Sequence, residues 1–111
     1  MKDLVFDSVV IGGGAAGMAA ALELDRAGFS CAIVEREEAL GGILTQCIHN
    51  GFGLIEFNEE LSGPEFAERI EERLAGTRIT SFTGATVMEL DASGDIKTLY
   101  CYTGAHGVMR L

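Results

Sequence analysis

The chain is poor in basic residues, in cysteine and in long apolar runs. Its 111 residues include 8 Lys and Arg against 17 Asp and Glu, which gives a formal net charge of −9. Surfaces that bind nucleic acid need clustered Lys and Arg, so this balance argues against nucleic-acid partners and against anionic membrane surfaces. The apolar fraction of 48% is that of a folded domain and excludes a disordered acidic tail.

The scarcity of cysteine and histidine excludes two further classes. Three widely spaced cysteines make no disulfide framework, which predicts a reducing, cytoplasmic location. Cys47 and His49 are two residues apart, but zinc needs about four ligands at recognisable spacings and the others are scattered, so we predict no metal. The uncharged stretch 8–22 carries four glycines and is shorter than the roughly 20 apolar residues of a membrane span.

Hydrophobic patterning predicts an α/β fold. Residues 4–11 are apolar and β-branched, 15–27 are rich in Ala, Leu and Met up to the stop signal Gly28, and 30–35 are again apolar. A strand, a tight turn, a helix and a second strand make a βαβ unit with a right-handed crossover. This unit occupies residues 1–36.

The rest of the chain divides into three predicted parts. Residues 37–63 have no periodicity and predict a long loop, of the kind that is usually functional. Residues 64–83 predict a helix, with the apolar stripe Phe66, Ile70 and Leu74, and a third parallel strand. Residues 84–111 predict an antiparallel β-meander. We expect the parallel strands in the order 3-2-1, which leaves the first strand as an uncovered apolar edge.

The strongest motif is Gly12-x-Gly14-x-x-Gly17, directly after the first strand. Gly12 lets the chain leave the strand in a tight turn, Gly14 lets the backbone approach a pyrophosphate, and Gly17 lets the helix pack closely on the sheet. The helix N-terminus at Ala15 and Ala16 then offers free N–H groups and a positive dipole end to an anion. The alternative is a glycine-rich turn without a ligand.

An acidic residue supports the nucleotide interpretation. Glu35 ends the second strand, 18 residues after Gly17, where it would accept hydrogen bonds from the ribose hydroxyls of an adenosine. Its charge would repel a 2′-phosphate, which disfavours NADP. The βαβ unit alone does not choose between FAD and NAD.

Residues 35–53, which include the pair Gly41-Gly42 and the stretch Gln46-Cys47-Ile48-His49, carry a family resemblance. The chain resembles the FAD/NAD(P)-dependent oxidoreductases of the pyridine nucleotide–disulfide reductase superfamily, a group of two-dinucleotide-binding-domain flavoproteins. It is most similar to the class associated with anaerobic glycerol-3-phosphate dehydrogenase. The resemblance covers most of this chain but only the first part of the family's architecture. It implies a Rossmann-like FAD-binding domain and, because no second glycine motif follows, an N-terminal fragment.

The resemblance implies roles for individual residues. Gly12, Gly14 and Gly17, with Ala15 and Ala16, would face the FAD pyrophosphate, and Gly41 and Gly42 would approach it from the other side. Glu35 would hold the adenosine ribose, with Arg36 beside the adenine end and the backbone of Val87 at the adenine edge. Gln46 and Cys47 would lie near the isoalloxazine.

Cys47 is the candidate catalytic residue. A CxxxxC pair is absent, because the positions five before and five after Cys47 are Gly42 and Phe52, so dithiol–disulfide chemistry is not expected. A single cysteine beside a flavin could still react as a thiolate or sulfenic acid. The alternative is a small residue that packs under the flavin. His49 is either a proton donor near the flavin or a polar loop residue.

Three functions stay open. The first is the FAD-binding portion of an oxidoreductase that passes electrons between a nicotinamide nucleotide and an unidentified second substrate. The second is a non-catalytic nucleotide-binding module, or a truncated product that a second subunit or chain completes. The third, an NAD-binding domain, is disfavoured by the paired glycines and the meander. The sequence does not name the electron donor or acceptor.

Overall fold

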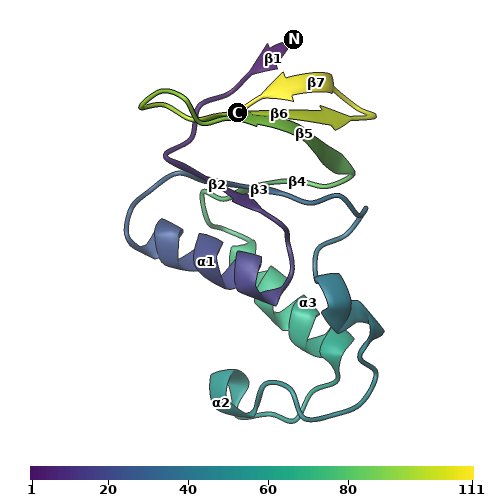
Figure 1. Cartoon of the computed structure of the whole chain (residues 1–111). Coiled ribbons are helices and arrows are strands. Elements are labelled where there is room, and N and C mark those ends of the chain that lie inside the picture. The colour runs from purple at the N-terminus through teal and green to yellow at the C-terminus, as the bar shows by residue number, and fades with distance from the viewer.

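A computed structural model describes residues 1–111 and shows three layers (Figure 1). The elements in chain order are β1 (Lys2–Asp3), β2 (Ser8–Ile11), α1 (Ala15–Arg26), β3 (Cys31–Val34), the 3₁₀ helix η1 (Gly42–Gln46), α2 (Leu54–Phe57), α3 (Gly63–Leu74), β4 (Thr80–Phe82), β5 (Ala85–Asp91), β6 (Thr98–Thr103) and β7 (Gly107–Arg110). The parallel sheet β2-β3-β4 is the middle layer. Helices cover one of its faces, and the sheet β1-β7-β6-β5 covers the other.

The predicted βαβ unit is confirmed. Strands β2 and β3 pair in parallel from Ser8 opposite Cys31 to Ile11 opposite Val34, and α1 connects them. Strand β4 pairs in parallel with the other side of β3. The predicted order 3-2-1 is therefore correct, and β2 has a free edge. Ile11, at the end of this edge strand, is 58% exposed.

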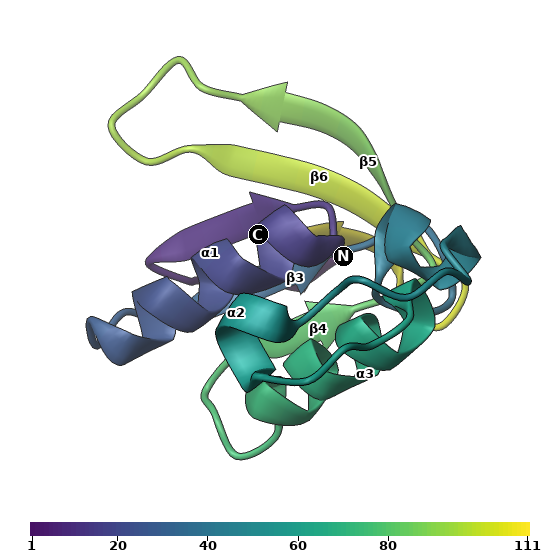
Figure 2. The ribbon, with the colours of Figure 1, turned by 90° about the horizontal axis from the view of Figure 1, so that it is seen from below.

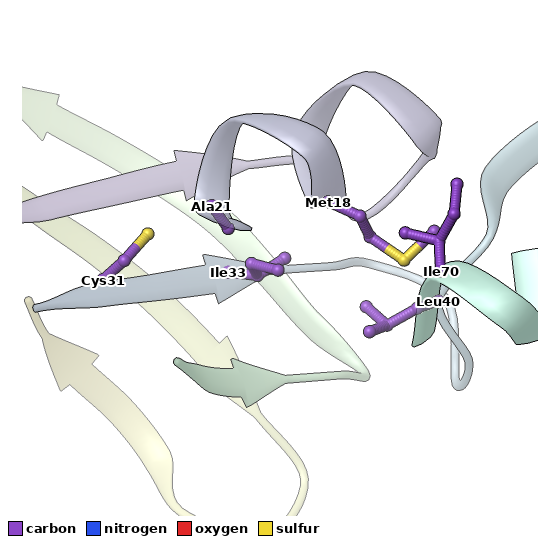
Figure 3. Close-up of a cluster of buried hydrophobic side chains, with 6 residues drawn as sticks. All are labelled: Met18, Ala21, Cys31, Ile33, Leu40 and Ile70. Carbon is purple, nitrogen blue, oxygen red and sulfur yellow. The ribbon is translucent and has the colours of Figure 1, made fainter. Parts of the chain in front are cut away.

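Strand β3 is buried on both faces and connects two hydrophobic clusters. Cys31 and Ile33 point toward the helices, in a cluster with Met18, Ala21, Leu40 and Ile70 (Figure 3). Val34 belongs to the cluster on the meander side, with Ala85, Leu99, Cys101, Met109 and Leu111. Burial raises the pKa of the Cys31 and Cys101 thiols. Both thiols are thus held in their neutral form in the core.

The prediction of one continuous strand over residues 4–11 is wrong. Lys2 and Asp3 pair in parallel with β7, and only Ser8–Ile11 belongs to the parallel sheet. The intervening segment crosses from one sheet to the other, and the Leu4 and Phe6 side chains pack against the meander-side cluster. An apolar run that crosses between two layers has the same composition as a single buried strand.

The segment 37–63 has more structure than its lack of periodicity predicts. It contains η1 and α2, and Phe52 and Leu61 form an isolated antiparallel bridge. The Phe66 ring on α3 stacks on Phe52, with ring centroids 6.0 Å apart, and meets Phe57 edge-on at 5.8 Å. Figure 2 shows α1, α2 and α3 on the same side of the parallel sheet. These aromatic contacts join α2 to α3 across the sequence, so no local period reveals them.

The predicted meander is confirmed. Strands β5, β6 and β7 pair antiparallel in chain order, and Ile96 is exposed in the turn before β6. The pairing of β1 with β7 adds a fourth strand. The Arg110 guanidinium donates to both carboxylate oxygens of Asp3, at 2.5 and 2.8 Å. None of the helices has the length and apolar character needed to cross a membrane.

Candidate nucleotide-binding site

The turn between β2 and α1 is built on two glycines with different requirements. Gly12 has φ +105, a conformation that side-chain-bearing residues rarely adopt, and its N–H donates to the Val34 carbonyl at 2.8 Å. Gly17 is required for space, because a Cβ there would collide with the Gly12 carbonyl oxygen and lie 3.3 Å from Val10 Cγ1. The first turn of α1 therefore rests directly on the backbone of the glycine turn.

The N-terminus of α1 is open to an anion. Gly14 is the N-cap residue, no side chain caps the helix, and its first turn contains no acidic residue. The first N–H groups of a helix have no partner within the helix, and the dipole adds partial positive charge at this end. Because nothing in the chain caps Ala15 and Ala16, the residues present fit a phosphate group.

Glu35 is a buried acid that the backbone holds in place. Its side chain is 8% exposed and accepts hydrogen bonds from the N–H groups of Gly13, at 2.8 Å, and Glu37, at 2.7 Å. A carboxylate has about four acceptor positions, so both oxygens keep capacity for a hydroxyl ligand. The carboxylate therefore has a fixed orientation before any ligand arrives.

A cavity of about 360 Å³ lies between the glycine turn and the meander. It brings together four of the predicted residues from three parts of the chain, Gly12, Glu35, Arg36 and Val87. Ile11, Val34, Ala85 and Thr86 complete the lining. Arg36 is exposed, and its guanidinium lies 3.6 Å from the Glu37 carboxylate. The cavity is thus lined by apolar residues together with one acid, Glu35, and one base, Arg36.

The paired glycines Gly41 and Gly42 pack against the glycine turn. The Gly41 N–H donates to the Gly13 carbonyl oxygen at 2.8 Å. A Cβ on Gly42 would lie 3.2 Å from Gly14 Cα, a tighter contact than most side chains make, so these two backbones pack closely. The tertiary fold therefore places Gly41 and Gly42 beside Gly14 although 27 residues separate the motifs.

Gln46 and Cys47 lie at the far end of η1 and do not line this cavity. Gln46 is exposed and Cys47 is half-buried, with its carbonyl oxygen accepting from the Gly63 N–H at 2.7 Å. All three cysteines are free. The His49 ring lies 5.2 Å from the Phe52 ring, and its Nδ1 is 3.1 Å from the Asn50 carbonyl oxygen. No group of three or more His, Cys, Asp or Glu side chains is arranged to hold a metal ion.

Sequence reasoning missed several residues of the site. Gly13 is buried and donates to Glu35, and a Cβ on it would collide with the Leu40 side chain. Its position inside the glycine run was an available signal. Thr86 lies beside the predicted Val87 and lines the same cavity. Gly63, which contacts Cys47, was also missed, because the contact joins residues 16 positions apart that no local spacing connects.

The glycine turn, the acid at the end of the next parallel strand and the meander that closes the cavity define a Rossmann-like dinucleotide-binding domain. Residues 7–93 match the model of the FAD-binding domain family, and the chain belongs to that family. FAD is accordingly the cofactor of this domain. A resident FAD also fits the open helix N-terminus and the held carboxylate described above.

Known proteins with similar sequences and folds agree with this family. A thioredoxin reductase of Aquifex aeolicus is 34% identical over 92% of the chain and 31% of its own length. One from Ureaplasma parvum is 35% identical over 72% of the chain and 25% of its own length. The L-proline dehydrogenase of P. horikoshii shares the fold, with a TM-score of 0.84 and 23% identity over 98% of the chain and 21% of that protein.

These matches show a flavoprotein domain of the pyridine nucleotide–disulfide oxidoreductase type. The narrower resemblance, to the class associated with anaerobic glycerol-3-phosphate dehydrogenase, stays a prediction. The chain spans a quarter to a third of the length of the curated relatives it matches.

Proposed function

We propose that the chain is the N-terminal FAD-binding portion of an FAD-dependent oxidoreductase. The complete protein would pass electrons between a nicotinamide nucleotide and a second substrate, with the bound flavin supplying the hydride and electron chemistry. The residues of this chain bind and orient the cofactor. The observation that carries the proposal is the convergence of the open α1 N-terminus, the paired glycines and the held Glu35 carboxylate around one turn.

Two groups of residues would bind two different parts of FAD, the pyrophosphate and the adenosine. The pyrophosphate would lie against the start of α1 and the paired glycines, where the proposal assigns contacts to Gly12, Gly14, Ala15, Ala16, Gly17, Gly41 and Gly42. The adenosine would occupy the cavity at the end of β3. There Glu35 would accept from the ribose hydroxyls, Arg36 would lie beside the adenine, and the Val87 backbone would meet its edge. The cavity lining supports this division, because its apolar residues suit the adenine base and the Glu35 carboxylate suits the ribose hydroxyls.

The flavin ring would lie toward η1, where Gln46 and Cys47 are the candidate contacts. Cys47 is half-buried and has no paired cysteine, which supports either a single reactive thiol or a small packing residue. Alkylation of Cys47 in the complete protein, followed by an assay of flavin reduction, tests the reactive-thiol role. Unchanged flavin reduction after alkylation would rule out a reactive thiol at this position.

Titration with three nucleotides tests the proposal. We expect FAD to raise the melting temperature of the chain, and the fluorescence of FAD to fall when it binds. NAD and NADP should not raise the melting temperature. Stabilisation by NAD alone would show an NAD-binding domain instead. Glu35→Gln should weaken FAD binding by about tenfold, since hydrogen bonds to a charged acceptor contribute about 1.5–3 kcal/mol. Glu71→Gln, on the exposed face of α3, is the matched control and should bind normally.

The second candidate function is a non-catalytic module that a second chain completes. The free edge of β2 favours it, because a cavity of about 590 Å³ lies between this edge and the β5–β6 hairpin and exposes apolar Val5 and Ile96. An assay of NADH-dependent dye reduction separates the two candidates. The chain alone should show little turnover in both cases. The non-catalytic module would be favoured only by a partner chain that forms a complex of defined stoichiometry with this chain and raises its FAD content. The three free cysteines support a cytoplasmic location for either function.

A further inference from the structure

Gly63 lies at the point where α3 begins, and it has no space for a side chain. A Cβ there would collide with the Leu44 carbonyl oxygen, and it would lie 2.5 Å from the Cys47 carbonyl oxygen and 2.7 Å from Cys47 Cβ. Two of these three atoms belong to the backbone, which cannot rotate away as a flexible side chain can. The φ angle of Gly63 is not positive, so this glycine is required for space and not for conformation.

Each N–H group at the start of α3 has a hydrogen-bond acceptor within the chain, and one of these acceptors is the Cys47 carbonyl oxygen. Ser62 is the N-cap residue of a capping box, in which the Glu65 N–H donates to the Ser62 hydroxyl and the Ser62 N–H donates to the Glu65 carboxylate. Pro64 has no N–H. The remaining donor, the Gly63 N–H, is bonded to the Cys47 carbonyl oxygen at 2.7 Å. This helix end is therefore occupied by the chain itself and does not bind an anion.

The segment that ends at Cys47 is also packed at its other end, where Gly41 contacts both α3 and the glycine turn. A Cβ on Gly41, at the other end of η1, would lie 2.8 Å from Thr45 Cγ2 and 3.2 Å from Ala67 Cβ on α3. The Gly41 N–H is in turn bonded to the Gly13 carbonyl oxygen. The segment 41–47 is therefore held between α3 on one side and the glycine turn on the other.

We propose that Gly63 is a positioning residue for the flavin-side segment 41–47. Because Gly63 has no side chain, the backbone of Leu44 and Cys47 packs directly against the first turn of α3. This packing sets where the Cys47 side chain lies relative to the FAD site. This inference rests on the proposed function for its meaning, because that function places Cys47 beside the flavin. Its geometry and its first test do not depend on FAD.

The test compares Gly63→Ala with Gly94→Ala. Gly94 is exposed, has no positive φ, and has no neighbour closer than 3.7 Å to an added Cβ, so its variant should behave as the unaltered chain. The readout is the rate at which iodoacetamide alkylates Cys47, followed by peptide mass spectrometry, while Cys31 and Cys101 stay buried. We expect Gly63→Ala to change this rate at least about threefold, because thiol reactivity follows exposure and surroundings. A rate within experimental error of the control would overturn the proposal.

Ser62→Ala separates positioning from a general loss of stability. It removes the cap of the same helix end but adds no atom near Cys47, so it should lower the melting temperature without the change in alkylation rate. Equal changes in both variants would show that only helix stability matters and would overturn the proposal.

A measurement on the unaltered chain covers the case in which Gly63→Ala does not fold. Alkylation of Cys47 should shift the amide resonances of Gly63 and Leu44 in a ¹H–¹⁵N spectrum and leave that of Gly94 unchanged. Unshifted Gly63 and Leu44 resonances would contradict the proposal. FAD titration of the unaltered chain reports separately on the proposed function, because a chain that fails to bind FAD would still give either thiol result.

Discussion

The two glycine-rich segments around the site are held in place by different means. The turn at residues 12–17 is fixed within its own βαβ unit, where Gly17 packs on the Gly12 carbonyl and Gly12 is bonded to the adjacent strand. The segment 41–47 has no such local support and is held by Gly13 on one side and Gly63 on the other. The first arrangement is complete within one βαβ unit, and the second depends on packing between separate elements. The spacing of residues 12–17 therefore predicts the structure of the turn, whereas the pair Gly41-Gly42 does not by itself predict that Gly13 and Gly63 are neighbours of the segment 41–47.

The largest expected effect comes from breaking the local arrangement. Gly17→Ala places a methyl group on the Gly12 carbonyl, and neither backbone can move without separating α1 from β2. We expect a loss of about 3 kcal/mol of unfolding free energy or a failure to fold, as for severe overpacking. Urea denaturation followed by circular dichroism measures it.

Gly104→Ala is the control for this change, because an added Cβ there has no neighbour within 4 Å. A Gly17→Ala chain as stable as this control would mean that α1 can move away from β2 at little cost, and the contrast between the two segments would then fail.

The second largest loss of stability is expected at Glu35, which is bonded to the glycine turn and lines the cavity. Glu35→Gln leaves one acceptor oxygen for the two backbone N–H groups of Gly13 and Glu37. We expect a loss of about 1–3 kcal/mol of unfolding free energy, the usual cost of a buried donor without a partner. Urea denaturation without nucleotide measures this separately from FAD binding. Unchanged stability would show that the carboxylate is not held before the ligand arrives.

A smaller effect is expected when the support of segment 41–47 is loosened. Ser62→Ala removes the N-cap of α3 and should cost about 1 kcal/mol of unfolding free energy. The hydrogen bonds from Ser62, the backbone N–H first and the hydroxyl second, lower the pKa of Glu65 from its ordinary value of 4.5. A lowered pKa stabilises the folded chain above pH 4.5, and this contribution is lost as the pH falls through the lowered value.

Melting curves between pH 3 and pH 7 test this linkage. The difference in melting temperature between the unaltered chain and Ser62→Ala should shrink as the pH falls below about 4.5. A difference that is constant across this range would mean that the Ser62 hydroxyl does not contribute to the lowered pKa of Glu65.

The smallest effect is expected outside both segments. Asp3→Asn breaks the paired hydrogen bonds to Arg110, which lower the pKa of the Asp3 carboxyl from its ordinary value of 3.8. The pair is exposed, so its contribution is screened by salt and is lost as the pH falls through the lowered pKa. We expect a small drop in melting temperature at neutral pH and low salt, and none at 1 M NaCl. A drop that persists at high salt would indicate a role in packing β1 on β7.

The sequence predicted the parts of the fold that have a local signature. Glycine spacing and apolar runs identified β2, α1 and β3, and the stripe Phe66, Ile70 and Leu74 identified the face of α3 that packs on the core. The errors fell where the chain crosses between layers. Residues 4–7 resemble a strand in composition because Leu4 and Phe6 pack against the meander-side cluster while the segment crosses between the two sheets. Helix α2 is held by the Phe66 ring on α3, and no local period predicts that contact.

The candidate site shows the same division. Gly12, Gly14, Gly17 and Glu35 follow from their positions at the ends of two strands, because a parallel sheet brings those ends to one edge. The bonds from Gly13 and Glu37 to Glu35 depend on the exact path of the backbone after β3. Composition and spacing carry no information on that path.

By itself the sequence determined the βαβ unit, the glycine turn, its acid and the family of the domain, because each rests on residues whose spacing is set by one strand or one turn of helix. Only the tertiary structure decided that Gly42 meets Gly14, that Val87 faces Glu35 across one cavity, and that Gly63 holds Cys47. The physical reason is that these contacts join residues 16 to 52 positions apart, where close packing of backbones and not local conformation selects the neighbour.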